Sequence, residues 1–378
     1  MNKPDICKNC SIYSHNKGAG YCPSPFGSDL YGIKIIGEKI GGLEAIKAKT
    51  FVPNSASGSK LNQVFKLLNK NSQGFKFGNL ISCQPNKDTL ENMPFEFDAI
   101  NFCRQIHLYK WLKADGTNYI LGLGKLAMRE LTGFSGIKLD RESINHIRGY
   151  PIKTNYGWVV NTYSPAFVRK GKPQYTHYLK EDLEKLFFVR EHGWVLPEYD
   201  FRYHPEKDFL KSYYYKAKEL DSEIPIYYDI ETEDSADTEE DERQGLTSNL
   251  IKTIQFCYEK DKAVLVNWCE DNMAFIKLML KLPNVKVGFN SYNFDDPRIL
   301  DKGVEIAGVK IDLMWMFKHW NPGLERGLQM VASLFNYPEP WKHKSNSDEG
   351  FYGCSDANAY SYIFPKLKEK MIKERIWD

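Results

Sequence analysis

The chain has 378 residues, of which 42% are hydrophobic and 14% aromatic, and its formal net charge at pH 7 is +2. This length exceeds that of a typical single domain and predicts two domains, each with a substantial core. An apolar run of about 18 residues is absent from the sequence, which argues against a membrane span. Met1 to Asp5 do not open a secretory signal. We therefore expect a cytoplasmic protein, in the host cytoplasm if its source is viral.

The charge is unevenly distributed along the chain. Residues 1–200 carry 27 lysines and arginines against 18 acidic residues, whereas the remainder carries 24 against 31. A basic front half is typical of a domain that contacts a polyanion, although a well-solvated surface has the same composition.

Eight cysteines without a secretion signal favour metal binding or free thiols over disulfides. A C-x-x-C pair opens the chain, and two further cysteines follow, the second of them in a helix predicted over residues 97–111. Such a set could hold zinc or an iron–sulfur cluster, or remain free thiols. The four candidates are Cys7, Cys10, Cys83 and Cys103, with Cys22 as a spare.

Strand-like and helix-like runs alternate through the first half, which predicts an α/β fold. Each strand-like run is short, apolar and followed by a glycine or polar turn. The predicted strands are Ile33–Ile36, Asn79–Cys83, Tyr119–Gly124 and Trp158–Thr162, and the predicted helices cover 61–68 and begin near Ala127.

The turns carry short motifs: Gly37-Glu38 before Gly41, Phe51-Val52-Pro53, N-x-x-x-C-x-P over residues 79–85, and L-G-x-x-A over residues 123–127. In this order they resemble the motifs of the iron–sulfur, or family 4, uracil-DNA glycosylases, and the resemblance runs from about Cys7 to Leu186. The resemblance implies a three-layer glycosylase-like domain over residues 1–193 that flips a base out of DNA. It also implies that Phe51 stacks on that base and Asn79 reads its edge. Glu38 matches the acidic residue of the first motif. By the same resemblance, a [4Fe-4S] cluster is ligated by Cys7, Cys10, Cys83 and Cys103.

One departure bears on activity. Where the family has His-Pro-Ser, this chain has Ser164-Pro165-Ala166, and a serine hydroxyl is a weaker donor to the departing base than a histidine. Three readings stay open for the domain: excision of uracil, binding of a base or single strand without excision, and a purely structural role for Phe51 and Asn79. Residues 194–223 are aromatic and charged, and we interpret them as an ordered connector.

In the second half, Ile226 to Thr232 predicts a strand that ends in two carboxylates. Asp229 and Glu231 are two residues apart and therefore share one face. Paired carboxylates are typical ligands of Mg²⁺ or Mn²⁺, although a D-x-E pair is also common on the outer face of a strand.

Two later segments favour the metal. Asn290 to Asp295 follows another short strand, and Tyr352 and Asp356 are four apart on a predicted helix. In this order the segments resemble the 3′→5′ exonucleases with four acidic ligands and a tyrosine that proofread for replicative DNA polymerases. The resemblance covers residues 224–378 and implies a ribonuclease H-like fold. It assigns the metal to Asp229, Glu231, Asp295 and Asp356, with Tyr352 orienting the attacking water; Asp296 competes with Asp295.

Four carboxylates would neutralise two divalent ions, the usual requirement for in-line phosphodiester hydrolysis. Predicted helices over residues 324–335 and 364–377 complete the second domain, and no polymerase motif follows. We expect a 3′→5′ exonuclease that acts on single-stranded DNA 3′ ends. It would work either alone or as the front part of a phage replication polypeptide, with a polymerase domain or subunit as partner. The alternatives are a glycosylase or uracil reader, and an inert replisome adaptor.

Overall fold

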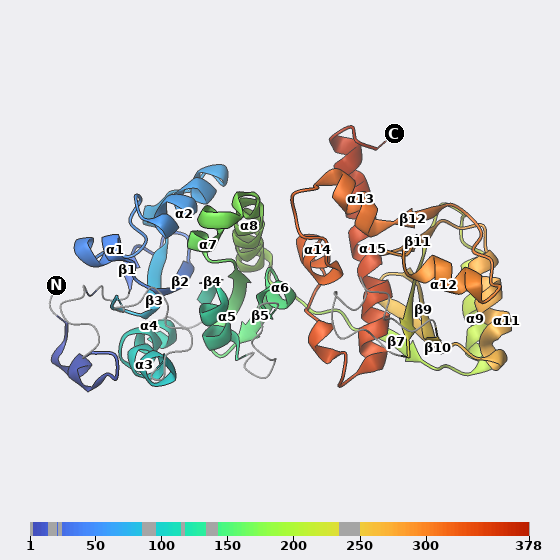
Figure 1. The fold of residues 1–378 in the computed structure, drawn as a ribbon, viewed down its shortest axis with the longest axis horizontal. Coiled ribbons are helices and arrows are strands. Elements are labelled where there is room, and N and C mark those ends of the chain that lie inside the picture. The colour runs from blue at the N-terminus through green and yellow to red at the C-terminus, as the bar shows by residue number, and fades with distance from the viewer. Residues whose placement is uncertain are drawn as a thin grey trace. The chain divides into compact units, whose positions relative to one another are not determined.

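The computed structural model describes residues 3–13, 21, 25–84, 96–114, 118–133, 143–233 and 250–377. The chain divides into two compact units, Met1–Val195 and Leu196–Asp378. Each unit is built on one six-stranded mixed sheet with helices packed on it, which confirms the predicted α/β class (Figure 1). Within the described residues, no helix combines the length and apolar character needed to cross a membrane.

The sheet of the first unit has the strand order β1-β3-β2-β4-β6-β5. Its four central strands are parallel, and β1 and β5 pair antiparallel at the two edges. The central strands are buried almost throughout, as expected for a parallel sheet covered on both faces. The strands are β1 Phe26–Gly27, β2 Ile33–Lys39, β3 Lys76–Ile81, β4 Asn118–Leu123, β5 Pro151–Thr154 and β6 Gly157–Thr162.

Helices cover both faces of this sheet and form three layers with it (Figure 1). On one face lie α2 Ala56–Leu67, α7 Pro165–Gly171 and α8 Thr176–His192. On the other lie α3 Glu96–Cys103, α4 Tyr109–Ala114 and α5 Lys125–Thr132, with a π-helical turn at Arg104–Leu108. Two further short helices are α1 Gly42–Lys47 and α6 Ser143–Ile147, and 3₁₀ turns occur at Asp5–Asn9, Ser72–Gly74 and Pro173–Tyr175.

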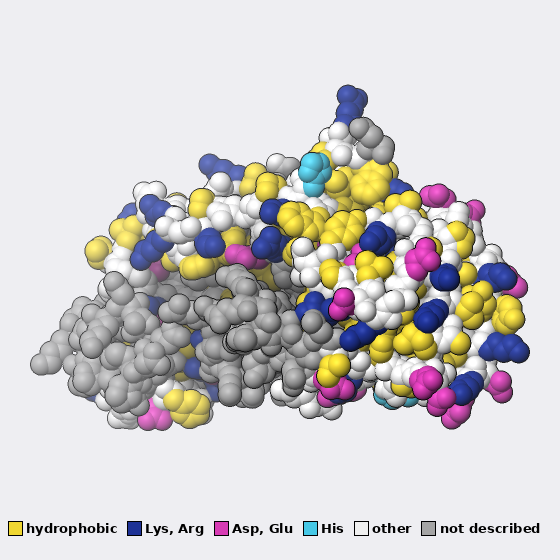
Figure 2. Space-filling model, turned by 45° about the vertical axis from the view of Figure 1, so that its right-hand side comes forward, with side chains coloured by type: hydrophobic (Ala, Val, Ile, Leu, Met, Phe, Trp, Pro, Cys, Tyr) yellow, Lys and Arg dark blue, Asp and Glu magenta, His cyan; other side chains and the backbone are white. Residues whose placement is uncertain are grey.

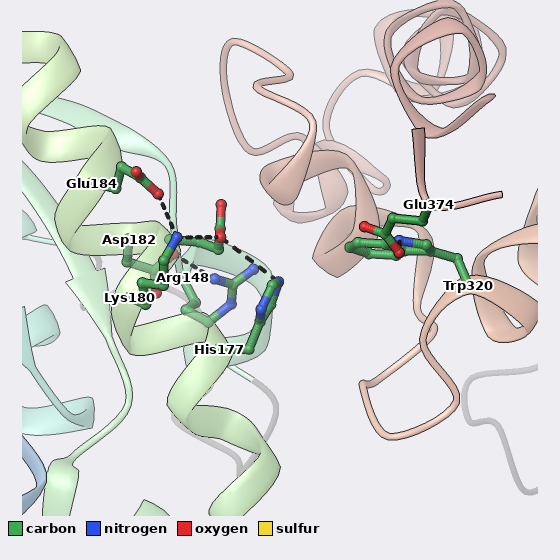
Figure 3. A network of polar contacts seen from close by, with 8 residues as sticks. Arg148, His177, Lys180, Asp182, Glu184, Trp320 and Glu374 are labelled. Carbon is green, nitrogen blue, oxygen red and sulfur yellow. Dashed lines mark hydrogen bonds and ion pairs between the residues drawn. The ribbon is translucent and has the colours of Figure 1, made fainter. Parts of the chain in front are cut away.

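A buried ion pair joins the turn before β5 to α8. Arg148 donates to Asp182 over 2.5 Å (Figure 3). Both side chains are buried, and the guanidinium lies over the Tyr178 ring. The adjacent Gly149 carbonyl accepts from Lys185, also on α8, over 2.8 Å. The ion pair therefore has a structural role, because removal of Arg148 or of Asp182 would leave the other charge buried without compensation.

The sheet of the second unit has the order β12-β11-β8-β9-β10-β7. Strand β9 is antiparallel to both of its neighbours, β8 and β10, and β11 and β12 run parallel to β8. The strands are β7 Asp200–Tyr203, β8 Ile226–Thr232, β9 Ile251–Glu259, β10 Lys262–Asn267, β11 Lys286–Gly288 and β12 Lys310–Asp312. The helices are α9 Lys207–Lys218, α11 Glu270–Lys281, α12 Asp295–Asp301, α13 Leu313–Trp320, α14 Leu328–Leu334 and α15 Glu349–Lys373, with a 3₁₀ turn at Lys342–Lys344.

The long helix α15 crosses one face of this sheet, while α9 and α11 cover the opposite face (Figure 1). At Gly353 the helix comes so close to β9 that an added Cβ would lie 2.8 Å from the Gln255 amide nitrogen. This close approach brings the first turns of α15 over β8 and β9.

Several predicted boundaries change. The presumed connector supplies β7, which pairs with β10, and α9, which packs on α11, so most of residues 194–223 belong to the second unit. The predicted helix over 364–377 is the end of α15, which continues through Pro365. The helix predicted over 324–335 begins only at Leu328, and the strand predicted at Asn79–Cys83 spans Lys76–Ile81.

On the face of the second unit seen in Figure 2, lysine and arginine side chains are interspersed with aspartate and glutamate. Among the described residues in that view, therefore, surface charge alone does not mark a path for a polyanion.

Candidate active site

Strand β8 places two carboxylates on the face of the sheet that α15 covers. Its residues alternate, and Tyr228 and Ile230 join the core formed with α9 and α11. Asp229 and Glu231 therefore project from the other face. The strand has the predicted bounds, and its apolar half explains why it forms: one face is buried in the core.

Helix α15 brings a third carboxylate to the same place. The carboxylate oxygens of Asp229, Glu231 and Asp356 lie within 4.8 Å of one another. Three hard oxygen donors at this spacing fit Mg²⁺ or Mn²⁺, which would be held by these residues. The structure thus brings together three of the four predicted ligands, from two segments separated by more than 120 positions in the sequence.

The electrostatics of the three groups call for a cation. Burial raises the pKa of Asp229 to about 7, and the Asp356 carboxylate adds to the effect. Burial and the Asp229 charge raise the pKa of Glu231 well above its usual range. Like-charged carboxylates in a buried site resist ionising together, and a bound divalent ion would remove that resistance.

The neighbouring aspartates at the start of α12 have different surroundings. Asp295 accepts a hydrogen bond from the Ile230 amide over 2.9 Å, and burial together with the Asp229 charge raises the pKa of Asp295 well above its usual range. Asp296 instead accepts from the Tyr228 hydroxyl and, over 2.8 Å, from Lys310. The geometry therefore favours Asp295 as the fourth ligand, although it lies outside the group of three.

Tyrosines at helical spacing line the site-facing side of α15. Tyr352, Asp356 and Tyr360 are four residues apart, so they share one face of the helix. Tyr360 donates to the Asp229 carboxylate over 2.6 Å, and its hydroxyl therefore ties α15 to β8. Tyr352 accepts from the Lys342 ammonium over 2.6 Å, which leaves its own proton available for another acceptor.

Both oxygens of Asp356 are engaged by residues that precede α15. The Trp341 indole donates to Oδ1 over 2.5 Å, and Lys342 donates to Oδ2 over 3.0 Å. Burial by itself would lower the pKa of Lys342, but the Asp356 carboxylate and the Tyr352 hydroxyl outweigh it and raise this pKa well above its usual range.

No protein-family model and no curated protein matches the chain. Among solved structures, the chain is similar to Escherichia coli RNase D, an exoribonuclease involved in structured RNA processing, with 14% identity over 47% of this chain and 46% of that one and a TM-score of 0.36. Trypanosoma brucei RNase D in complex with RNA U12 shares 17% identity over 45% of this chain and 63% of its own, with a TM-score of 0.35. Brucella melitensis NrnC bound to pGG shares 12% over 47% and 85%, with a TM-score of 0.34.

The matched region spans less than two thirds of both RNase D chains. TM-scores and sequence identities this low establish no function for this chain. None of the three is described as a glycosylase or a polymerase, so those two resemblances stay predictions.

In the first unit, the four predicted cluster cysteines line one cavity. Cys103 is buried and its sulfur accepts from the Ser82 amide over 3.2 Å, while Cys7 lies 3.5 Å from the His107 ring. Burial raises the pKa of Cys103 to about 12, so a cationic centre would be needed to hold its thiolate. The four cysteines thus fit a metal cluster in the kind of donor atom they offer and in their position around one cavity. Cys22 lies outside the described residues.

The predicted base-pocket residues are only partly brought together. An added Cβ on Gly37 would lie 2.5 Å from the Asn79 side-chain oxygen and 2.8 Å from the Phe51 ring, so both side chains lie against that glycine. Phe51 has a φ of 48°, a left-handed conformation that costs energy in a non-glycine residue. Glu38 follows Gly37 on β2, whereas Ser164 lies beside Gly124, after β6 and two strands away.

Three residues of the second-unit site escaped prediction from sequence. Tyr360 could have been found, because it continues the four-residue spacing of Tyr352 and Asp356. Trp341 and Lys342 carry no such signal, because the turn that holds them is positioned by Gln329, whose side chain accepts from both of their amides.

Proposed function

We propose that the second unit is a metal-dependent exonuclease that removes nucleotides from the 3′ ends of DNA. The observation that carries the proposal is the meeting of Asp229, Glu231 and Asp356 within 4.8 Å, with Asp295 hydrogen-bonded to the intervening amide of β8. This set matches, residue by residue, the acidic ligands of the exonucleases that the sequence resembles.

Each residue has a distinct part in the proposed reaction. Divalent ions held by the carboxylates would supply hydroxide from water and would stabilise the leaving 3′ oxygen. The negative charges of the carboxylates would balance those of the ions. Tyr360 fixes the orientation of Asp229 through its 2.6 Å hydrogen bond. The proton of the Tyr352 hydroxyl is free to orient the attacking water, since its oxygen already accepts from Lys342.

The proposed substrate is a single-stranded 3′ end, and the proposed setting is proofreading within a DNA replication polypeptide, possible partners being a polymerase domain or subunit. Both follow from the order of the motifs in the sequence. The predicted phage source and host cytoplasm belong to the same proposal.

A 5′-labelled single-stranded DNA incubated with Mg²⁺ tests the activity. We expect a ladder of products shortened from the 3′ end with the wild type, and none with Asp229→Ala. Asp271→Ala, which removes an exposed carboxylate on α11, is the matched control and should cleave like the wild type. A matched RNA strand decides between the two nucleic acids, and intact substrates of both kinds would refute the proposal.

A second proposal concerns the first unit, and the cavity lined by four cysteines favours it. We propose that Cys7, Cys10, Cys83 and Cys103 hold a [4Fe-4S] cluster in a glycosylase-like domain that binds DNA. The approach of both Phe51 and Asn79 to Gly37 supports a base-binding place at that end of the sheet. Ser164 in place of the histidine favours binding over excision.

Two measurements test this second proposal. An absorption band at about 400 nm is expected for a [4Fe-4S] centre, whereas a colourless protein with bound zinc would contradict the cluster proposal. Uracil- and thymine-containing strands, incubated with a chelator to silence the nuclease, separate the activities: abasic product means excision, and tighter binding without product means a uracil reader.

A further inference from the structure

Lys342 places a fixed positive charge inside the acidic site. It begins the 3₁₀ turn Lys342–Lys344, and its amide donates to the Gln329 side chain over 2.7 Å. The preceding Trp341 donates to the same oxygen over 3.1 Å, is fully buried, and donates its indole proton to Asp356. The segment that carries the lysine is therefore held by Gln329 through its backbone and by Asp356 through the Trp341 side chain.

The ammonium group contacts the acidic group at Asp356. It lies 3.0 Å from Asp356 Oδ2 and 2.6 Å from the Tyr352 hydroxyl, and it also acts electrostatically on Asp229 and Glu231. The lysine side chain is 26% exposed and the aspartate 6%, so water screens this contact poorly.

A charge count shows what this position implies. Asp229, Glu231, Asp356 and Asp295 together supply four negative charges when ionised, enough for two divalent ions. With the Lys342 ammonium in place, three negative charges remain, so one divalent ion leaves a net charge of −1 and a second leaves +1. The first ion meets a charge of −3. The second meets only −1, against −2 if Lys342 were uncharged, and would leave the site positive, so it binds much more weakly than the first.

We propose that Lys342 is a resident cation that takes the place of one divalent ion until nucleic acid arrives. The site then holds a single ion in the free protein and takes up a second only when a phosphate group adds negative charge. This inference rests on the proposed nuclease site. It makes the charge of Lys342 the feature that couples occupancy by the second ion to the presence of substrate.

Mn²⁺ titration of the full chain, followed by the electron paramagnetic resonance signal of free Mn²⁺, tests the proposal. We expect the wild type to bind one ion at this site when no nucleotide is present, and two ions when thymidine 5′-monophosphate is added. Lys342→Met should bind two ions without nucleotide, the first at least about tenfold more tightly. Lys342→Arg, which keeps the charge, should behave like the wild type.

Lys344→Met is the matched control, because this lysine lies in the same 3₁₀ turn but pairs with Glu339 and covers the Phe351 ring. Lys342→Gln replaces Lys342→Met if the latter does not fold. An unchanged ion count and affinity in Lys342→Met, in a wild type that binds Mn²⁺ and degrades DNA, would overturn this inference alone. A wild type that neither binds Mn²⁺ nor cleaves would overturn the nuclease proposal with it.

Discussion

Replacing Asp229 with asparagine is expected to abolish hydrolysis and yet to stabilise the metal-free protein at pH 8. The reason is that Asp229 is ionised at a cost in the folded state. Burial, with the Asp356 charge second, raises the pKa of Asp229 from 3.8 to about 7. Asparagine keeps an oxygen that can accept the Tyr360 hydrogen bond but carries no charge to be repelled.

The sign and size follow from the linkage between proton binding and folding. Because the folded-state pKa is raised, the folded protein binds more protons than the unfolded chain between about pH 4 and pH 7. The stability that protonated Asp229 contributes is complete below pH 4 and is lost as the pH rises through 7. Each pKa unit is worth about 1.4 kcal/mol. Ionisation of Asp229 thus costs the folded state on the order of 4 kcal/mol. We expect roughly half of this cost to remain in the wild type, because Glu231 takes up a proton when Asp229 ionises and so reduces the repulsion.

A gain on the order of 2 kcal/mol raises the melting temperature of a unit of this size by about 4–8 °C. Differential scanning calorimetry in EDTA measures this, and the transition of the second unit is identified as the one that Mn²⁺ shifts in the wild type. The difference between Asp229→Asn and the wild type should shrink at pH 5, and Asp271→Asn should show none. An asparagine variant that melts at or below the wild type at pH 8 would refute the electrostatic reasoning.

Three further outcomes are expected. Tyr360→Phe should lower kcat about 10- to 100-fold, because a hydrogen bond to a charged group is lost, and an unchanged rate in a single-turnover assay would count against its positioning role. Asp295→Asn should lower the rate more than about 10³-fold, whereas Asp296→Asn should lower the melting temperature and leave the rate within about fivefold; equal rate losses in the two would remove the distinction between them. Cys103→Ser should abolish the absorption band at about 400 nm, and a band that survives would exclude this cysteine as a ligand.

The local patterns of the second unit could be predicted from sequence, because they depend on short-range periodicity. In Ile226 to Thr232, Ile230 separates Asp229 from Glu231, so a strand is enough to put both carboxylates on one face, as the structure has them. The four-residue spacing of Tyr352 and Asp356 likewise required only a helix.

What could not be predicted depends on contacts between distant segments. Asp200–Tyr203 is four residues long and mostly exposed, and it becomes a strand only because β10 offers an unpaired edge. Lys342 enters the site because Gln329 and Asp356, 13 and 14 positions away, hold its turn in place. The choice between Asp295 and Asp296 needed the positions of Ile230 and Lys310.

The central claim is that carboxylates from β8 and α15 hold a divalent ion together. Anomalous diffraction from crystals grown with Mn²⁺ and thymidine 5′-monophosphate tests it most directly. We predict a manganese peak within about 2.2 Å of oxygens from Asp229, Glu231 and Asp356. Manganese bound elsewhere, with these three carboxylates free of it, would contradict the account.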